Sequence, residues 1–220
     1  MPKPASPTPA PYHHGDLRAA LIAAGEEVLA ERGAAGVTLR ECARRAGVSH
    51  AAPSHHFGDL AGFLSAIAAQ GFARLVAAVR DQRASTDATD LDAQMVATCS
   101  AYVGFARKEP NMFRVMFRCD LLDRDSEMLL AATKETFAEL TSVILQQRGE
   151  PEISADALYE TIGADTIIED ILIGWCHLHG LAHLLIEGQL EHMTGGDEEA
   201  FLRRVLADNG PRLSRVLRRN

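Results

Sequence analysis

The sequence lacks the patterns that would place it in a common enzyme class. It has no nucleophile-elbow pentapeptide, no glycine-rich phosphate-binding loop and no dispersed catalytic-triad signature. Nine histidines and many carboxylates could still build acid–base chemistry, and turnover of a small molecule by the purified protein would favour an enzyme. Because the patterns are absent, we expect neither an enzymatic activity nor a cofactor.

Paired cysteines and a leader segment are also lacking. The four cysteines, Cys42, Cys99, Cys119 and Cys176, form no C-x-x-C pair, and no apolar signal segment stands at the N-terminus. These observations favour a protein of the reducing cytoplasm.

No apolar run is long enough to indicate a membrane span. The longest segment without Asp, Glu, Lys or Arg covers residues 171–186, which is 16 residues against the roughly 20 that a span requires. Acidic Glu169, Asp170 and Glu187 flank it. We interpret it as a helix that is apolar on most of its circumference because it contacts both the core and a second subunit.

An excess of basic residues is missing as well. The formal net charge is −8, and residues 1–60 contain six Lys or Arg and six Asp or Glu, so all the excess acid lies in residues 61–220. This balance argues against a nucleic-acid module unless the cations cluster locally.

Helical periodicity recurs along the chain, and no segment alternates as a strand does. Residues 1–14 are Pro-rich with little to bury, which predicts a disordered arm. The fold class is therefore all-α with about nine to ten helices. The helices are expected near residues 16–31, 38–46, 50–56, 59–82, 91–106, 111–118, 126–147, 154–190 and 198–208.

Residues 38–57 have the organisation of a helix-turn-helix. Thr38 and Glu41 match a capping box, in which the Thr hydroxyl accepts from the Glu41 amide and the Glu carboxylate reaches back. Gly47 can adopt the left-handed conformation that ends this helix, and Val48 then packs inward. Ser49 is predicted to cap the second helix, which tolerates Pro53 near its start.

This stretch resembles the N-terminal domain of TetR/AcrR transcriptional regulators, whose pattern runs T-x-x-x-I-A-x-x-A-G-V-S-x-x-x-x-Y-x-H-F-x-x-K. The resemblance covers about residues 12–75. The matching residues are Thr38, Ala43, Ala46, Gly47, Val48, Ser49, His56 and Phe57. Two positions depart from the pattern, since Ser54 replaces the usual Tyr and Leu60 the usual Lys.

The resemblance implies that the second helix of the motif reads the major groove of DNA. The hydroxyls and His56 would donate to phosphate oxygens, and His50 and His55 would reach base edges. The two alanines, Ala51 and Ala52, would contact thymine methyl groups. The predicted DNA-binding residues are Thr38, Arg40, Arg44, Arg45, Ser49, His50, Ala51, Ala52, Ser54, His55 and His56.

Trp175, His179 and Gly180 form a W-x-x-x-H-G pattern that resembles one C-terminal subfamily of TetR-type regulators. The resemblance implies that this helix and the last one pair with their symmetry mates in a homodimer. Two recognition helices about one DNA turn (~34 Å) apart would then bind a pseudo-palindromic operator. The predicted interface residues are Trp175, His179, Gly180, His183, Phe201 and Val205.

The resemblance also implies a pocket for a small hydrophobic or amphipathic effector. Met and Phe at helical spacing are core residues far more often than ligand contacts, so ordinary core is the alternative for every candidate. The candidates are Met95, Cys99, Tyr102, Phe105, Met112, Phe113, Met116, Phe117, Phe137, Trp175 and His179.

A metal sensor is a further alternative. Cys176, His179, His183 and Glu187 recur at steps of three, four and four, so they could share one metal ion on a helix face. Histidines in such a helix are more often buried or interfacial residues, and we therefore expect no metal.

These observations combine into one organisation. We expect an arm over residues 1–14, a helix-turn-helix DNA-binding domain over 15–60, a connecting helix over 61–82 and a ligand-binding and dimerisation domain over 83–220. The expected function is that of a cytoplasmic, ligand-responsive repressor that a small molecule releases from DNA. A helical dimer that has lost DNA binding is the other alternative, which Ser54, Leu60 and the neutral N-terminal region favour.

Overall fold

The computed structural model describes residues 14–150, 154, 156 and 166–217. The predicted arm lies outside them except for His14, as does most of the stretch from 154 to 165. The described ranges contain nine α-helices, two short 3-10 turns and no strand, so the all-α prediction is confirmed. In chain order the elements are α1 (His14–Arg32), η1 (Ala34–Gly36), α2 (Leu39–Arg45), α3 (Ala52–Phe57), α4 (Leu60–Ala84), α5 (Leu91–Lys108), α6 (Pro110–Met116), α7 (Glu127–Gln147), α9 (Thr166–Ile186), η2 (Glu191–Met193) and α10 (Glu198–Leu217).

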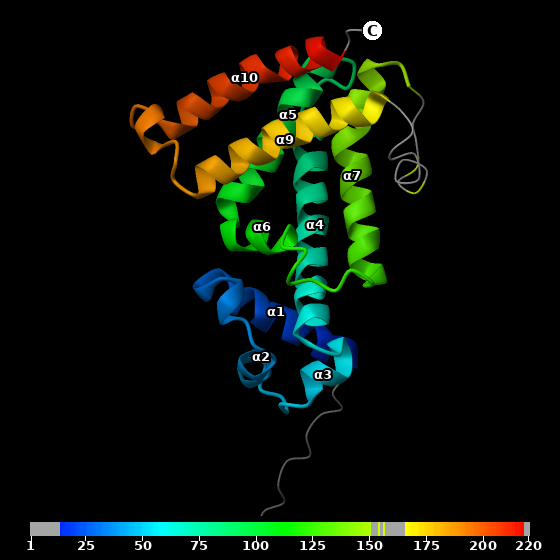
Figure 1. Ribbon diagram of the computed structural model, residues 1–220, viewed down its shortest axis with the longest axis vertical. Coiled ribbons are helices and arrows are strands. Elements are labelled where there is room, and N and C mark those ends of the chain that lie inside the picture. Colours follow the sequence, from blue (N-terminus) through cyan, green and yellow to red (C-terminus); the bar gives the residue numbers. More distant parts are fainter. Residues whose placement is uncertain (1–13, 151–153, 155, 157–165, 218–220) are drawn as a thin grey trace, which may run out of the picture.

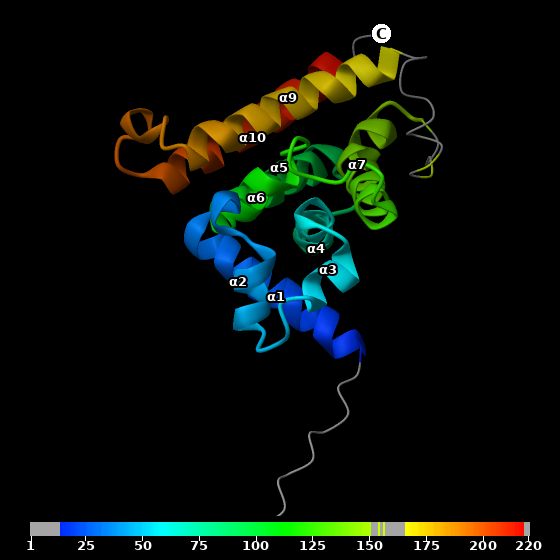
Figure 2. The same cartoon turned by 60° about the horizontal axis from the view of Figure 1, so that its bottom comes forward.

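The helices α1, α2 and α3 form a small head at one end of the molecule, and α4 runs from this head into a larger helical body (Figure 1). Helices α5 and α7 pack along α4, while α6 lies between the body and α1. Helices α9 and α10 cross the far end of the body as an outer layer, which Figure 2 shows from a second direction.

Head and body share one hydrophobic core. Fully buried Val28 of α1, Phe63 of α4 and Phe113 of α6 belong to the same contiguous cluster. Since burial of apolar surface is the main stabilising term, the head is held against the body by the same interaction that folds it. The division near residue 60 therefore lies within continuous packing and stays a prediction.

Helix α4 owes its strongly apolar sequence to its central position. By length and composition it could cross a membrane, but 67% of its most apolar stretch is buried inside the protein. Asp59 begins the helix by accepting a hydrogen bond from the Gly62 amide at 2.9 Å. We therefore identify it as a core helix.

One half of the predicted capping box is wrong. The Thr38 hydroxyl does accept from the Glu41 amide at 3.2 Å, as expected for an N-cap. The Glu41 carboxylate, however, accepts from the guanidinium groups of Arg44 and Arg45 and does not reach back to Thr38. Both kinds of hydrogen bond involve the charged carboxylate, but the guanidinium donors add a positive charge that the backbone amide lacks.

The predicted Ser49 cap is also wrong. Helix α3 begins at Ala52, its N-cap is Ala51, and no side chain caps it. Pro53 has no amide hydrogen, so a helix starting at Ser49 would lack its first regular bond. The first such bond joins the His55 amide to the Ala51 carbonyl at 3.2 Å, and Ser49 instead accepts from Ala52 at 3.1 Å in a tighter turn.

Close packing of α1 on α4 requires a glycine. A Cβ at Gly25 would lie 2.6 Å from the nearest atoms of Phe63 and Ile67, both of which are fully buried. By contrast, a Cβ at Gly104 of α5 would meet nothing within 4 Å.

These two glycines give a matched pair of stability variants. Gly25→Ala should lower the free energy of unfolding by about 1–3 kcal/mol, because the added methyl overpacks the core. Gly104→Ala should raise it by roughly 0.5–1 kcal/mol, because alanine has the higher helix propensity. Urea denaturation measures both, and an increase in stability for Gly25→Ala would contradict the packing described.

Candidate functional site

Helix α3 lies at the tip of the head (Figure 1). Together with the turn before it, this helix exposes several small polar side chains. Ser49, His50, Ala51, Ser54 and His55 are exposed, whereas Pro53 is buried beneath them. The helix thus directs its imidazoles and hydroxyls outward from an apolar support.

Phe57 anchors the C-terminal end of α3. Its ring packs edge-on against Phe63 of α4 with centroids 4.9 Å apart, and the Arg18 guanidinium of α1 lies 5.2 Å from its centroid. The tip is therefore positioned by both of the longer helices that adjoin it.

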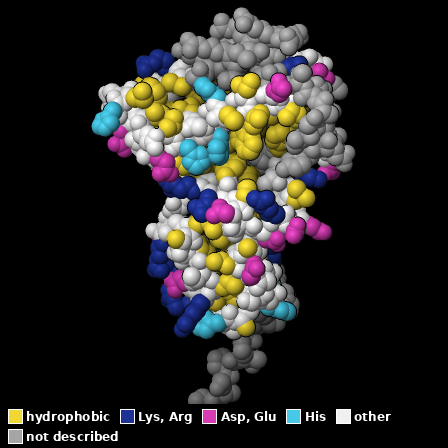
Figure 3. Space-filling view, viewed as in Figure 1, with side chains coloured by type: hydrophobic (Ala, Val, Ile, Leu, Met, Phe, Trp, Pro, Cys, Tyr) yellow, Lys and Arg dark blue, Asp and Glu magenta, His cyan; other side chains and the backbone are white. Residues whose placement is uncertain are grey.

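The cations of α2 are largely compensated by neighbouring carboxylates. Arg44 donates twice to Glu41 at 2.8 Å, and Arg45 donates to Glu41 at 3.2 Å and to Glu31 of α1 at 2.8 Å. These guanidinium groups lower the pKa of Glu41 to about 2. Figure 3 accordingly shows Lys and Arg along one edge of the head, with Asp and Glu close beside them.

Arg44 and Arg45 differ in how much of the side chain is exposed and could contact DNA. The Arg45 side chain is 16% exposed and joins α2 to α1, so its geometry favours a structural role. The Arg44 side chain is 64% exposed, and Arg40 and Thr38 are exposed beside it. Ala52 and His56 are half-buried.

A cavity of about 310 Å³ lies within the body, walled by α4, α5, α7, α9 and the end of α6. Six of the sequence-predicted ligand residues lie on its wall, namely Met95, Cys99, Met116, Phe117, Phe137 and Trp175. The wall also includes Phe72, Thr98, Cys119, Thr133, Thr136, Leu140, Thr141, Ile144, Ile171, Gly174 and Leu178. The α7 residues among these recur at steps of three and four, a helix-face signal that could have been found in the sequence.

Five of the predicted ligand residues are absent from the cavity wall. Tyr102, Phe105, Met112 and Phe113 belong to the main core, as the alternative interpretation held. His179 points inward, where its Nδ1 lies 2.8 Å from the Tyr102 hydroxyl. We therefore remove these five from the ligand-binding candidates.

His179 is held neutral by its surroundings. Burial, assisted by the nearby His183 ring, lowers the pKa of His179 to about 4. Burial also raises the pKa of Tyr102, although a hydrogen bond with the Trp175 side chain lowers this pKa in part. The pair therefore forms a neutral hydrogen bond inside an aromatic cluster with Phe113.

The possible metal ligands of α9 do not converge. Cys176 is exposed, His179 faces Tyr102, and Glu187 accepts from Arg114 at 2.8 Å. Within the part of the chain that the structure describes, no group of three His, Cys, Asp or Glu is arranged to hold a metal ion. The regular spacing in sequence is thus not matched by a common site.

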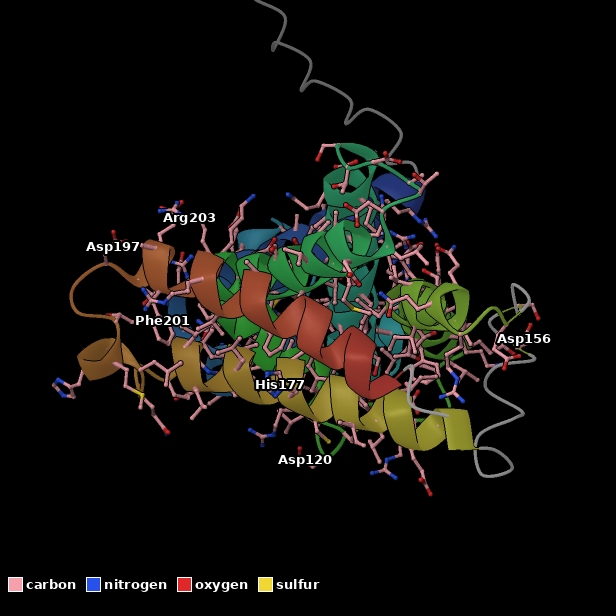
Figure 4. The ribbon with its side chains drawn as sticks, turned by 90° about the horizontal axis from the view of Figure 1, so that it is seen from above. Asp120, Asp156, His177, Asp197, Phe201 and Arg203 are labelled. Carbon is pink, nitrogen blue, oxygen red and sulfur yellow. The ribbon has the colours of Figure 1, made fainter. Side chains whose placement is uncertain are left out.

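The outer face of α9 is apolar and uncovered. Leu172, Ile173 and Leu184 are 50%, 53% and 40% exposed, and none of them was predicted as an interface residue. A Cβ at Gly180 would meet nothing within 4 Å, so this glycine leaves open space at the surface. Figure 4 shows α9 and α10 side by side in the outer layer, with His177 between them.

The predicted interface residues divide between the two sides of this layer. Trp175 is 42% exposed, whereas His179 and His183 pack their rings toward Phe113. Phe201 and Val205 of α10 are half-buried, and Phe201 packs against a small core cluster beneath the helix. The inward position of His179 and His183 makes them poor candidates for a subunit contact.

A helix-turn-helix head joined by a core helix to an all-helical, cavity-containing body is the architecture of a one-component DNA-binding regulator. The profile described as "Bacterial regulatory proteins, tetR family" matches residues 21–67, and that described as "Tetracyclin repressor-like, C-terminal domain" matches residues 95–209. The chain belongs to the TetR family of transcriptional regulators, which are DNA-binding proteins and not enzymes. The W-x-x-x-H-G subfamily remains a prediction.

Solved structures support this fold. A protein of unknown function from Rhodococcus sp. RHA1 is 28% identical, with a TM-score of 0.70 over 95% of this chain and 99% of that one. A tetR-family regulatory protein from Rhodococcus RHA1 (19%, TM-score 0.57, 91% and 96%) and the TetR-family regulator PfmR from Thermus thermophilus (14%, 0.56, 89% and 97%) share the fold. No curated protein matches the sequence.

The half-buried His179 ring predicts that the body is sensitive to acid. Its folded-state pKa of about 4 lies below the ordinary value of 6.5, so between these values the unfolded chain binds a proton that the folded chain does not. Stability should therefore fall by on the order of 1–3 kcal/mol as pH decreases through this window. His179→Asn keeps an acceptor for Tyr102 and should flatten the dependence in urea denaturation at several pH values, whereas exposed His192→Asn should leave it unchanged.

Proposed function

We propose that this protein is a cytoplasmic, ligand-responsive transcriptional repressor that binds a pseudo-palindromic operator as a homodimer and is released by a small molecule. The observation that carries the proposal is that one helix, α4, belongs to both working parts. Phe72 of α4 lies on the cavity wall, and Phe63 of α4 packs against Phe57 at the end of α3.

The separation of these two contacts along α4 makes coupling mechanically simple. Nine residues of α-helix span roughly 14 Å, and the helix between Phe63 and Phe72 is buried. A ligand that displaces Phe72 would therefore move the head with it. The displacement favours release only if the ligand binds the DNA-incompetent head spacing more tightly.

DNA reading is assigned to the exposed surface of α3, the turn before it and the start of α2. In this proposal His50 and His55 contact base edges, while Ser49, Ser54, His56 and Thr38 bind phosphate oxygens. Exposed Ala51 and half-buried Ala52 would contact thymine methyl groups. The guanidinium groups of Arg44 and Arg45 are both paired with carboxylates. We therefore expect the affinity for DNA to depend only weakly on salt concentration.

Dimerisation is assigned to the outer face of α9 together with α10. Four large apolar side chains exposed on one helix favour an interaction surface, since soluble monomers seldom expose contiguous apolar area. A two-fold axis through this layer would place the two heads on the same side of the dimer, as a palindromic site requires.

A charge on this face tests both dimerisation and DNA binding. Ile173→Asp should give a monomer by sedimentation and lose the footprint on DNA upstream of the protein's own gene. Leu130→Asp on α7, which is 42% exposed in the wild type, should keep both properties. Absence of protection by the wild-type dimer at modest ionic strength would contradict the repressor and favour a helical dimer without DNA binding.

Base reading and phosphate binding can be separated between α3 and the turn before it. His50→Ala should change the preferred base at one operator position, with a loss of about 1–3 kcal/mol on the best site. Ser54→Ala should weaken binding to all sequences alike; Thr38 is less suitable for this comparison because its hydroxyl also caps α2. Binding to a library of operator variants measures both, and identical profiles would refute the division of roles.

A further inference from the structure

The side chains that line the cavity in the described part of the chain are all uncharged. Among the described residues that line it, none is Asp, Glu, Lys, Arg or His. Its polar side-chain groups are the hydroxyls of Thr98, Thr133, Thr136 and Thr141, the thiols of two cysteines and the indole N–H of Trp175, which is hydrogen-bonded to Tyr102.

The threonine hydroxyls offer acceptors and no free proton. Each donates its hydrogen to a backbone carbonyl about one turn earlier in its own helix. Thr98 donates to Gln94 at 2.9 Å, Thr133 to Leu130 at 2.9 Å, and Thr136 and Thr141 each over 2.8 Å to Ala132 and Phe137. The oxygen of each hydroxyl keeps lone-pair capacity for a donor on a ligand.

The other polar groups near the cavity do not supply a cation. Burial raises the pKa of the Cys99 thiol to about 12, so this group stays protonated and is a weak donor. At the adjoining surface, Arg118 donates to Asp120 at 2.8 Å and Lys134 to Asp156 at 2.6 Å. Figure 4 shows Asp120 and Asp156 outside the layer of helices, away from its interior.

This arrangement discriminates between ligands by charge. A buried carboxylate or phosphate without a cation or strong donors loses its hydration with no compensation, which is severely unfavourable. A neutral hydroxyl or amide hydrogen would meet a threonine oxygen, and the rest of the molecule would contact Met, Phe, Leu, Ile and Trp side chains.

We propose that the cavity takes an uncharged, largely apolar molecule that carries a hydrogen-bond donor, and that it excludes carboxylates and phosphates of the same carbon skeleton. The inference rests on the proposed function only in treating this cavity as the effector site. It specifies the chemical class of effector, which the fold leaves open.

The protein contains its own reporter for this test. Trp175 is the only tryptophan in the sequence and lies on the cavity wall, so occupancy should change its fluorescence. The probes are 1-decanol, decanoate and decyl methyl ether, which share a chain and do not absorb with tryptophan. We expect decanol to bind at least tenfold more tightly than decanoate, and severalfold more tightly than the ether, which lacks a donor.

A variant with a new cation locates the effect. Half-buried Thr133→Lys should increase decanoate affinity at least tenfold and change decanol affinity little. Ala131→Lys adds the same charge to the exposed face of α7, off the cavity wall, and should leave both affinities unchanged. Circular dichroism checks that both variants keep their helices.

The outcomes separate this inference from the proposed function, because the titration uses DNA-free protein and the footprint uses no ligand. Decanoate binding as tightly as decanol, no response to decanol up to its solubility limit, or an equal gain in Ala131→Lys would overturn the inference and leave the repressor intact. A missing footprint would overturn the repressor, while the titration would still decide which molecules the cavity accepts.

Discussion

The burial of α4 is the constraint on which the rest of the structure depends. Phe63, Ile67 and Leu75 are fully buried along its length, so both the head and the body fold against the same helix. The buried Ser65 hydroxyl accepts a hydrogen bond from the Asp123 amide at 2.8 Å, which fixes α4 to the connection between α6 and α7. Close-packed interiors deform little, and this property supports the proposed transmission of a change at the cavity wall to the head.

The ion pairs of this protein serve mainly to hold its helices together, and they contribute little to the long-range attraction of other molecules. Arg74 of α4 donates at 2.9 Å both to Glu26 of α1 and to Glu109 at the start of α6, which joins three helices where head and body meet. In the head, Arg45 of α2 donates at 2.8 Å to Glu31 of α1 and joins those two helices in the same way. Such a head has a weak external field, which is why the proposed recognition of DNA relies on hydrogen bonds and apolar contacts at short range.

The cavity and the core use the same residue types. Phe113 and Met112 are buried in the main cluster, and Met116, about one turn later, belongs to the same cluster but also borders the cavity, as does the adjoining Phe117. An apolar side chain is equally suited to a packed core and to the wall of a cavity. Which of the two it occupies depends on the positions of the facing helices. The threonines of the wall were not predicted as ligand-binding residues. Their hydroxyls donate to carbonyls of their own helix, and this internal hydrogen bond allows a polar residue to occupy an apolar face.

The sequence by itself determined the helical class, most helix ranges and the turn of the helix-turn-helix, because periodicity, the Thr38 cap and the left-handed Gly47 (φ 68°) act within a few residues. It could also have shown that Pro53 prevents a Ser49 cap, since that effect is local. Tertiary structure alone decided the partners of Glu41, the inward turn of His179 and the wall of the cavity. Each of these depends on groups far apart in the chain that meet only when the helices pack, and no local pattern specifies that meeting.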